Sequence, residues 1–242
     1  MKKTISVLLL LSIALFCLAG CASKKDLDRD DDIKASLTAT TTTVVTTKTE
    51  DVQTTAEQEK YVSGYATSTN WTSSYLNLRY DVPYGWKMSD PLMLARVNNM
   101  YYDEGKGQYE EMIAQKRNNN GAMEKQVYMV ALDLSINFPN MTIDEIIQED
   151  IKNTEQQMKN LSTNGVEMKC NIDDPKQYLL CGMDFTMVHL ETDKYFNGTY
   201  TGTTYGWCLY RIAGDSVVMI SCSTPSGSDT LEYMLAGFSK LY

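Results

Sequence analysis

The stretch "YLNLRYDVPYGWKM", residues 75–88, marks where the chain begins to look folded. Apolar side chains alternate there with polar ones, at positions Leu76, Leu78, Tyr80 and Val82. A period of two is typical of a strand with one buried face. Pro83 cannot donate to a strand ladder and ends this one, while Gly85 permits the bend before Trp86. The stretch therefore predicts a half-buried strand, a tight turn and a buried tryptophan.

The N-terminal residues predict where the protein resides. Lys2 and Lys3 precede an almost unbroken apolar run from Ile5 to Leu18, shorter than the roughly 20 residues that span a bilayer. The run ends in Leu18-Ala19-Gly20-Cys21, which resembles the lipobox of bacterial lipoproteins. The resemblance implies cleavage before Cys21, acylation of its sulfur and anchoring at the extracytoplasmic face of the cell membrane. The alternative is an ordinary secreted protein, cleaved at a small-residue site, in which Cys21 carries no lipid.

The net charge disfavours one class of partner. Removing residues 1–20, which hold two lysines and no acidic residue, changes the formal charge from −9 to −11. Nucleic acid and anionic headgroups repel such a chain, so we expect no nucleic-acid partner. We expect contact with the membrane through the N-terminal lipid, and a protein or other envelope component as the partner.

Composition divides the chain into a leader, a linker and one domain. Residues 1–20 form the expected signal peptide. Residues 21–70 are acidic and rich in threonine, with few large apolar residues, and predict a disordered linker with a reach of roughly 40 Å. Residues 71–242 are long enough for one domain with its own core.

The second half of the domain shows clear element signals. Strands are expected at 126–138, where apolar and polar residues alternate, and at 166–172, 183–190 and 203–212. Residues 216–223 are apolar on both faces and predict a central strand covered on both sides. A helix is expected at 142–162, because Thr142 and Glu145 form a capping box before an apolar stripe. Gly214-Asp215 should join the last two strands as a hairpin.

Two regions have weaker patterns. Between 89 and 123 we expect a helical turn at 92–97, a helix at 108–117 and an exposed loop at 118–121. At the C-terminus a helix should begin near Ser228. It would place three apolar residues on one face, Leu231, Leu235 and Phe238.

The order of these elements, with Pro83, Gly85 and Trp86 after the first strand, is similar to the PsbP-like fold found in small bacterial lipoproteins. The resemblance covers nearly all of 71–242. It implies an α+β fold, in which an antiparallel sheet has helices packed on both faces. It implies no single activity, since such proteins are mostly accessory or binding proteins, and no functional residue carries over.

Four cysteines remain in the domain. Cys208 and Cys222 would face each other across the Gly214-Asp215 turn if the loop had three residues, at a separation that a disulfide tolerates. Cys170 and Cys181 flank Asp173-Asp174-Pro175 and could form a second bridge. Export favours oxidation, yet such thiols are also common as small buried residues, so both states are open.

Signals for catalysis, cofactors or metals are weak. His189, the only histidine, lies toward the end of an apolar face and is more often a core or rim residue there. The pairs Glu110-Glu111 and Asp173-Asp174 are interpreted as solvated faces and turns. No motif for a nucleophile, a phosphate loop or a dinucleotide appears, and no metal-ligand spacing. We expect no catalytic residue, no cofactor and no metal.

The aromatic stretch "YFNGTYTGTTYGW", residues 195–207, has two interpretations. It could be an exposed surface that stacks on sugars or peptides. The favoured interpretation is a hairpin that turns at Asn197-Gly198, with tyrosines covering the sheet.

These observations predict a lipid-anchored extracytoplasmic lipoprotein with a non-enzymatic binding or accessory domain. One alternative is a hydrolase or modifying enzyme that acts on envelope material, which would need a cleft with convergent polar groups and shifted pKa values. Another is a surface protein that binds a small ligand or glycan. A transporter's receptor ranks lower, because such receptors usually close two lobes around a ligand.

Overall fold

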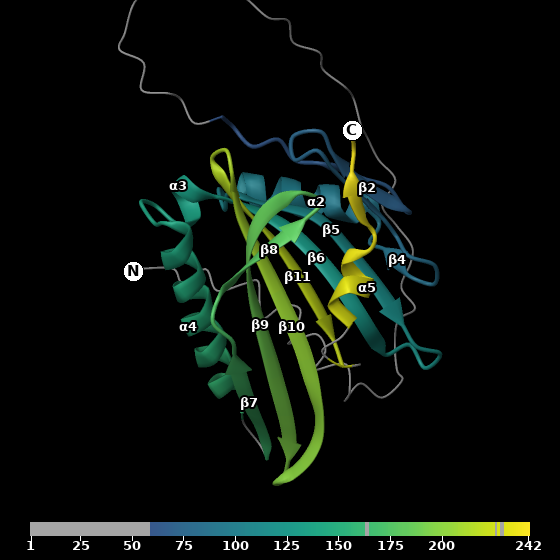
Figure 1. Ribbon diagram of the computed structural model, residues 1–242, viewed down its shortest axis with the longest axis vertical. Helices are drawn as coiled ribbons and strands as arrows, with labels where there is room; N and C mark the ends of the chain where they lie inside the picture. The colour runs from purple at the N-terminus through teal and green to yellow at the C-terminus, as the bar shows by residue number, and fades with distance from the viewer. Residues whose placement is uncertain (1–58, 163–164, 226, 228–229) are drawn as a thin grey trace, which may run out of the picture.

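A computed structural model describes residues 59–162, 165–225, 227 and 230–242. Its main element is a large antiparallel sheet (Figure 1). The strands of this large sheet, in spatial order, are β4 (Lys87–Met88), β5 (Gln108–Arg117), β6 (Met123–Asp133), β11 (Ser216–Thr224), β10 (Thr199–Ala213), β9 (Met183–Phe196) and β7 (Val166–Ile172), with β8 (Lys176–Leu180) also paired to β9. Every one of these neighbouring pairs is antiparallel, which is the sheet that the resemblance implied.

A small sheet and four helices complete the described part. The small sheet contains β1 (Tyr65–Ala66), β2 (Asn70–Ser73), β3 (Leu78–Asp81) and β12 (Phe238–Lys240). The helices are α2 (Pro91–Asp103), α3 (Leu134–Asn137), α4 (Ile143–Leu161) and α5 (Leu231–Leu235). Within the described ranges, no helix is long and apolar enough to cross a membrane.

The two faces of the large sheet bury separate cores. The first core lies between the large sheet and the small sheet, and includes Trp71, Tyr80 and Trp207. The second core lies between the opposite face and α4, and includes Tyr210 and Ile147. Figure 1 shows α4 beside β7, and α4 also contacts β10. A second sheet, with α5 as its only helical addition in the described chain, therefore covers one face where a helical layer was expected.

The opening stretch folds as its pattern predicts. Leu76, Leu78 and Tyr80 are buried, and β3 ends two residues before Pro83. Gly85 has a φ of 80°, in the left-handed region that glycine tolerates, and Trp86 is buried in the first core. Strand β11 is buried along its whole length, because both faces of the sheet are covered there.

The residues from 108 to 117 form strand β5, so the prediction of a helix there was wrong. Their composition favours a helix, since glutamate, methionine, alanine, glutamine and lysine are good helix formers. Nine of the ten residues instead pair with β6, and a bulge leaves Glu111 without a partner in the register. Pairing and burial thus override local propensity.

Other boundaries also differ from the prediction. The helical turn expected at 92–97 is the longer helix α2, and the strand expected at 126–138 ends at Asp133. The Asp133 carboxylate accepts hydrogen bonds from the backbone N–H groups of Ser135 and Ile136, and so caps α3. Phe238 begins β12 and does not extend α5, while Ser228 lies outside the described residues.

Helix α4 confirms its predicted start. The Thr142 hydroxyl accepts from the Glu145 N–H, and the Glu145 carboxylate accepts from the Thr142 N–H. This reciprocal capping box satisfies two of the N–H groups that the first turn leaves free. The exposed loop at 118–121 is likewise confirmed.

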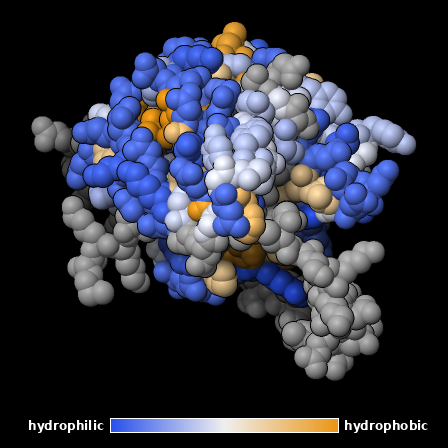
Figure 2. Space-filling view, turned by 90° about the horizontal axis from the view of Figure 1, so that it is seen from below, coloured by the Kyte–Doolittle hydropathy of each residue, from blue (hydrophilic) through white to orange (hydrophobic). Residues whose placement is uncertain are grey.

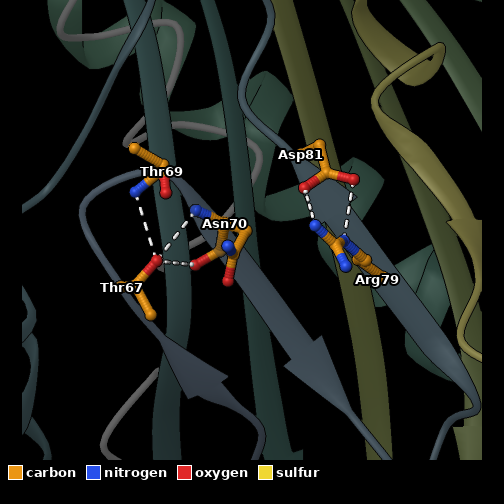
Figure 3. Close-up of polar contacts among 5 residues, drawn as sticks. All are labelled: Thr67, Thr69, Asn70, Arg79 and Asp81. Carbon is orange, nitrogen blue, oxygen red and sulfur yellow. Dashed lines mark hydrogen bonds and ion pairs between the residues drawn. The ribbon is translucent and has the colours of Figure 1, made fainter.

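Residues 59–70, assigned from composition to the linker, pack against the domain. Tyr61 is 5% exposed and belongs to the first core. The Thr67 hydroxyl accepts from the N–H groups of Thr69 and Asn70 and closes the turn between β1 and β2 (Figure 3). Nearby on β3, Arg79 donates two hydrogen bonds to Asp81. The domain boundary was predicted at residue 70 from composition, and the single tyrosine at position 61 does not change that composition enough to predict a fold there. The expected signal peptide, Cys21 and the linker up to residue 58 lie outside the described residues.

Candidate functional site

Two adjacent carboxylates are buried where β5 bulges. Glu111 is 2% exposed and Glu110 is 8% exposed, so the expectation of a solvated acidic pair was wrong. Neighbouring residues of a strand point to opposite faces, so Glu111 meets residues of the first core, and Glu110 lies on the side of Tyr128, in the second core. The sequence held no signal for the burial of this pair, because that burial depends on which other segments pack against the strand.

The Glu111 carboxylate is saturated with donors. It accepts from the Tyr61 hydroxyl at 3.1 Å, from the Gly64 N–H at 2.8 Å and from the Trp71 indole N–H at 3.0 Å. Burial raises the pKa of Glu111, and these hydrogen bonds oppose the rise. All three donors come from the segment 59–73, so Glu111 attaches that segment to the large sheet.

The Glu110 carboxylate is only partly satisfied. Gln108 donates to its Oε1 at 2.8 Å, and the Asn98 amide of α2 bonds both the N–H and the C=O of the Glu110 backbone. Among the described residues, Oε2 of Glu110 has no hydrogen-bond partner. The Tyr128 hydroxyl lies beside this carboxyl and likewise makes no hydrogen bond of normal geometry. Burial is the largest cause that raises the pKa of Glu110.

A cavity of about 180 Å³ opens beside these two groups, between α2 and the strands β5 and β6. Its polar lining includes Glu110 and Tyr128. Its apolar lining comes from Met93, Leu94, Val97 and Ile113. We call it the α2 cavity. A second cavity of about 160 Å³ lies on the side of β1, lined by both carboxylates and by α2 residues.

A larger polar cleft of about 470 Å³ adjoins the α2 cavity. It lies between the loop at Gly85 and the turn that joins β5 to β6, and Ser89 and Gln115 line both hollows. Its other lining residues include Lys87 and Arg117. Within the described part of the chain, no three His, Cys, Asp or Glu residues gather closely enough to hold a metal ion.

His189 lies at the rim of the first core with its side chain 12% exposed. Its Nδ1 is 2.9 Å from Oδ2 of Asp173, and its ring stacks on Trp207 with centroids 5.2 Å apart. Its Nε2 is buried 4.0 Å from Glu191. The carboxylate and the indole hold the ring in one place, which suits a structural role.

The bridge considered between Cys208 and Cys222 is contradicted by the strand register. The hairpin loop has two residues, because Ala213 pairs with Ser216, so Cys208 lies opposite Ser221. Neighbouring residues of a strand point to opposite faces. Cys208 therefore faces the second core and Cys222 the first, and both thiols are free.

The second possible bridge fails because of distance. Strands β7 and β8 both pair with β9 along the same edge of the sheet, and Asp173-Asp174-Pro175 lies between them. Cys170 lies opposite Thr192, whereas Cys181 adjoins the start of β9 at Met183. This length of β9 spans about 30 Å at roughly 3.3 Å per residue. Both thiols are free, and burial raises the pKa of each.

Sequence reasoning missed a buried carboxylate on α4. Asp150 accepts a hydrogen bond from the Tyr210 hydroxyl at 2.5 Å, inside the second core. Burial raises its pKa from 3.8 to about 6. The apolar stripe of α4 would have pointed to it, because Asp150 lies three residues after Ile147 on the same face.

The aromatic stretch forms the predicted hairpin between β9 and β10. Asn197 and Gly198 have φ of 48° and 78°, as a two-residue primed turn requires. Phe196 and Tyr200 are exposed near the turn. The turn lies at the lower end of the molecule in Figure 1. Figure 2 looks at that end and shows apolar residues in small patches among hydrophilic ones. The hairpin of the favoured interpretation agrees with this geometry. Tyr205 packs against the first core as that interpretation expects, whereas Phe196 and Tyr200 do not cover the sheet.

Comparisons with known proteins add one similarity. No family model matches the chain, and no curated protein matches it. Among solved structures, the chain is similar to the solution structure of cyanobacterial PsbP (CyanoP) from Synechocystis sp. PCC 6803. The identity is 9% and the TM-score 0.41, over 74% of this chain and 96% of that chain. The PsbP-like assignment made from Pro83, Gly85 and Trp86 stays a proposal, and function is argued below from the chain's own residues.

Proposed function

We propose that this protein is a lipid-anchored, extracytoplasmic lipoprotein whose domain binds a membrane or envelope component without catalysing a reaction. The lipobox-like Leu18-Ala19-Gly20-Cys21 supports the anchor. The formal charge of −11 after cleavage leaves the lipid as the attachment to the membrane. A domain anchored at this location would meet its partner at the membrane or in the envelope.

The exposed surface of α2 carries the binding role. Leu94 is the only buried residue of this helix. Four large side chains of the same helix are exposed, namely Leu92, Met93, Met100 and Tyr102, with exposed fractions from 47% to 77%. A surface helix usually turns such residues toward the core. Met93 and Met100 are seven residues apart and so lie on one face of the helix. Exposed apolar side chains that gather on one face mark surfaces that bind partners, so α2 is where we place the contact.

The catalytic alternative has less support, because the candidate catalytic groups already have structural roles. His189 is held by Asp173 and Trp207, and Glu111 holds the segment 59–73. Burial raises the pKa of the thiols at Cys208 and Cys222, which disfavours the reactive thiolate.

The anchor is tested by Cys21→Ser. We expect the variant to leave the membrane fraction and to lose the mass of the acyl chains, because the acylated sulfur is gone. Cys17→Ser, in the leader, is the matched control and should stay in the membrane. Unchanged membrane retention of Cys21→Ser would overturn the proposal of a lipid anchor.

The binding role is tested by a photo-reactive residue placed at Leu92 in native cells, followed by mass spectrometry. A probe at the exposed Glu149 of α4 is the control for non-specific capture. We expect one envelope protein or component crosslinked from position 92 and absent from position 149. Equal crosslinking from both positions would contradict a contact through α2.

A further inference from the structure

We propose that the α2 cavity binds a compact organic cation, a primary amine with a small apolar body, whose ammonium group contacts Glu110 and Tyr128. This inference deepens the proposed binding function by naming a ligand class for the domain. It rests on the proposed function, because it assumes that the domain binds its ligand without catalysing a reaction.

The first argument is the unsatisfied polar atoms. Glu110 is 8% exposed and Tyr128 is 2% exposed, and their carboxyl and hydroxyl groups lie beside each other, yet in the described chain Oε2 of the first and the hydroxyl of the second make no hydrogen bond of normal geometry. Buried polar groups in proteins almost always have partners. Both residues line the α2 cavity. A group bound in this cavity can complete both hydrogen bonds.

The second argument is charge. An ionised carboxylate only accepts hydrogen bonds, so its free oxygen needs a donor. Glu111 is the next residue along the chain and adds negative potential at Glu110. No lysine or arginine lines this cavity in the described chain, and Lys106 pairs with Glu104. An ammonium group donates to the carboxylate and to the tyrosine oxygen, whereas an anion is repelled.

The third argument is size and lining. A volume of about 180 Å³ corresponds to roughly six water molecules at about 30 Å³ each. That space suits a body of a single ring or a short alkyl chain. Four aliphatic side chains line the space around such a body, and the remaining amides of Gln115 and Gln126 bond each other. Ser89 and Tyr101 also line the cavity, so among the described residues Glu110 is its one acidic residue, in a wall of apolar and neutral polar side chains.

The experiment titrates the full-length protein, purified in a mild detergent, with benzylamine, benzyl alcohol and benzoate. These probes share a shape and differ in charge. By calorimetry we expect saturable binding of benzylamine, at least tenfold weaker binding of benzyl alcohol, and no binding of benzoate. Glu110→Gln should weaken benzylamine at least tenfold and leave benzyl alcohol unchanged. Glu167→Gln, an exposed acid on β7, is the control and should bind all three like the wild type.

Two results of the titration would overturn the inference, and neither depends on the test of the anchor. Absence of saturable benzylamine binding would overturn the inference, because water alone would then satisfy the two groups. Equal affinity of the wild type for benzylamine and benzyl alcohol would also overturn it, and this comparison stands even if Glu110→Gln fails to fold. Detergent partitioning of each probe is the same for wild type and variants and cancels between them, and a titration of each probe into detergent alone corrects the comparison between probes. A failed anchor test at Cys21 leaves this result unaffected, because the cavity lies within residues 89–128.

Discussion

Glu110 and Glu111 are neighbours in β5, are both buried, and both have a pKa that burial raises, yet they serve different ends. Glu111 accepts from three donors of the segment 59–73 and works as a structural clamp. Glu110 keeps one oxygen without a partner beside a cavity. The difference teaches that burial alone does not mark a binding site. A buried polar atom that lacks a hydrogen-bond partner is the better mark of a binding site.

The largest expected effect comes from removing the clamp. Glu111→Ala leaves two buried donors and one partly buried donor unsatisfied, at about 1–3 kcal/mol each before relaxation, so we expect a loss of about 3–5 kcal/mol in the free energy of unfolding. Glu110→Ala, the matched control, should cost about 1 kcal/mol or less. Urea unfolding of both variants measures the difference. Equal losses would remove the distinction between the two carboxylates.

Asp150 sharpens the comparison, because it is a buried carboxylate with one donor. Its pKa rises from 3.8 to about 6 on folding, so the folded state favours the protonated form. The stability that this preference contributes is complete below about pH 4 and is lost as the pH rises through about 6. The shift corresponds to about 3 kcal/mol.

Asp150→Asn mimics the protonated form and should lack this component. We therefore expect the stability of the wild type, measured relative to Asp150→Asn, to fall by about 2 kcal/mol between pH 4 and pH 7. Urea unfolding at a series of pH values measures it. A stability difference that does not vary with pH would show that Asp150 titrates normally in the folded state.

A smaller effect is expected where α2 meets the bulge. The Asn98 amide bonds the N–H and the C=O of Glu110, at 2.6 and 2.9 Å. Asn98→Ala should cost about 1–2 kcal/mol, since two backbone groups lose partners. Asn99→Ala, an exposed position on the same helix, is the control and should have little effect. Similar losses in both variants would point to helix propensity as the cause.

The smallest effect separates two buried tyrosines. Tyr61→Phe removes the hydroxyl that bonds Glu111 and should cost about 1 kcal/mol. Tyr128→Phe removes a hydroxyl without a normal hydrogen bond and should change stability by less than about 0.5 kcal/mol. A loss of 1 kcal/mol or more in Tyr128→Phe would show that Tyr128 and Glu110 bond each other, and would weaken the case for a ligand.

Local patterns predicted the elements whose signals are self-contained. The capping box at Thr142 and Glu145 is enough to predict where its helix begins, and Gly214-Asp215 is enough to predict the turn. The predictions that failed depended on contacts with distant residues. The helix expected at 108–117 became a strand because β6 lies beside it. The bridge between Cys208 and Cys222 failed because the loop has two residues and not three, and this difference puts the two thiols on opposite faces of the sheet.

The sequence by itself determined the half-buried strand and turn in residues 75–88, the helix that begins after Thr142, and the hairpin that ends in the buried strand β11. Each of these depends on residues close together in the chain. Only the tertiary structure decided that Glu111 clamps the segment 59–73 and that Glu110 borders the α2 cavity. The physical reason is that burial and hydrogen-bond satisfaction depend on which distant groups arrive at the same place, and no local pattern carries that information.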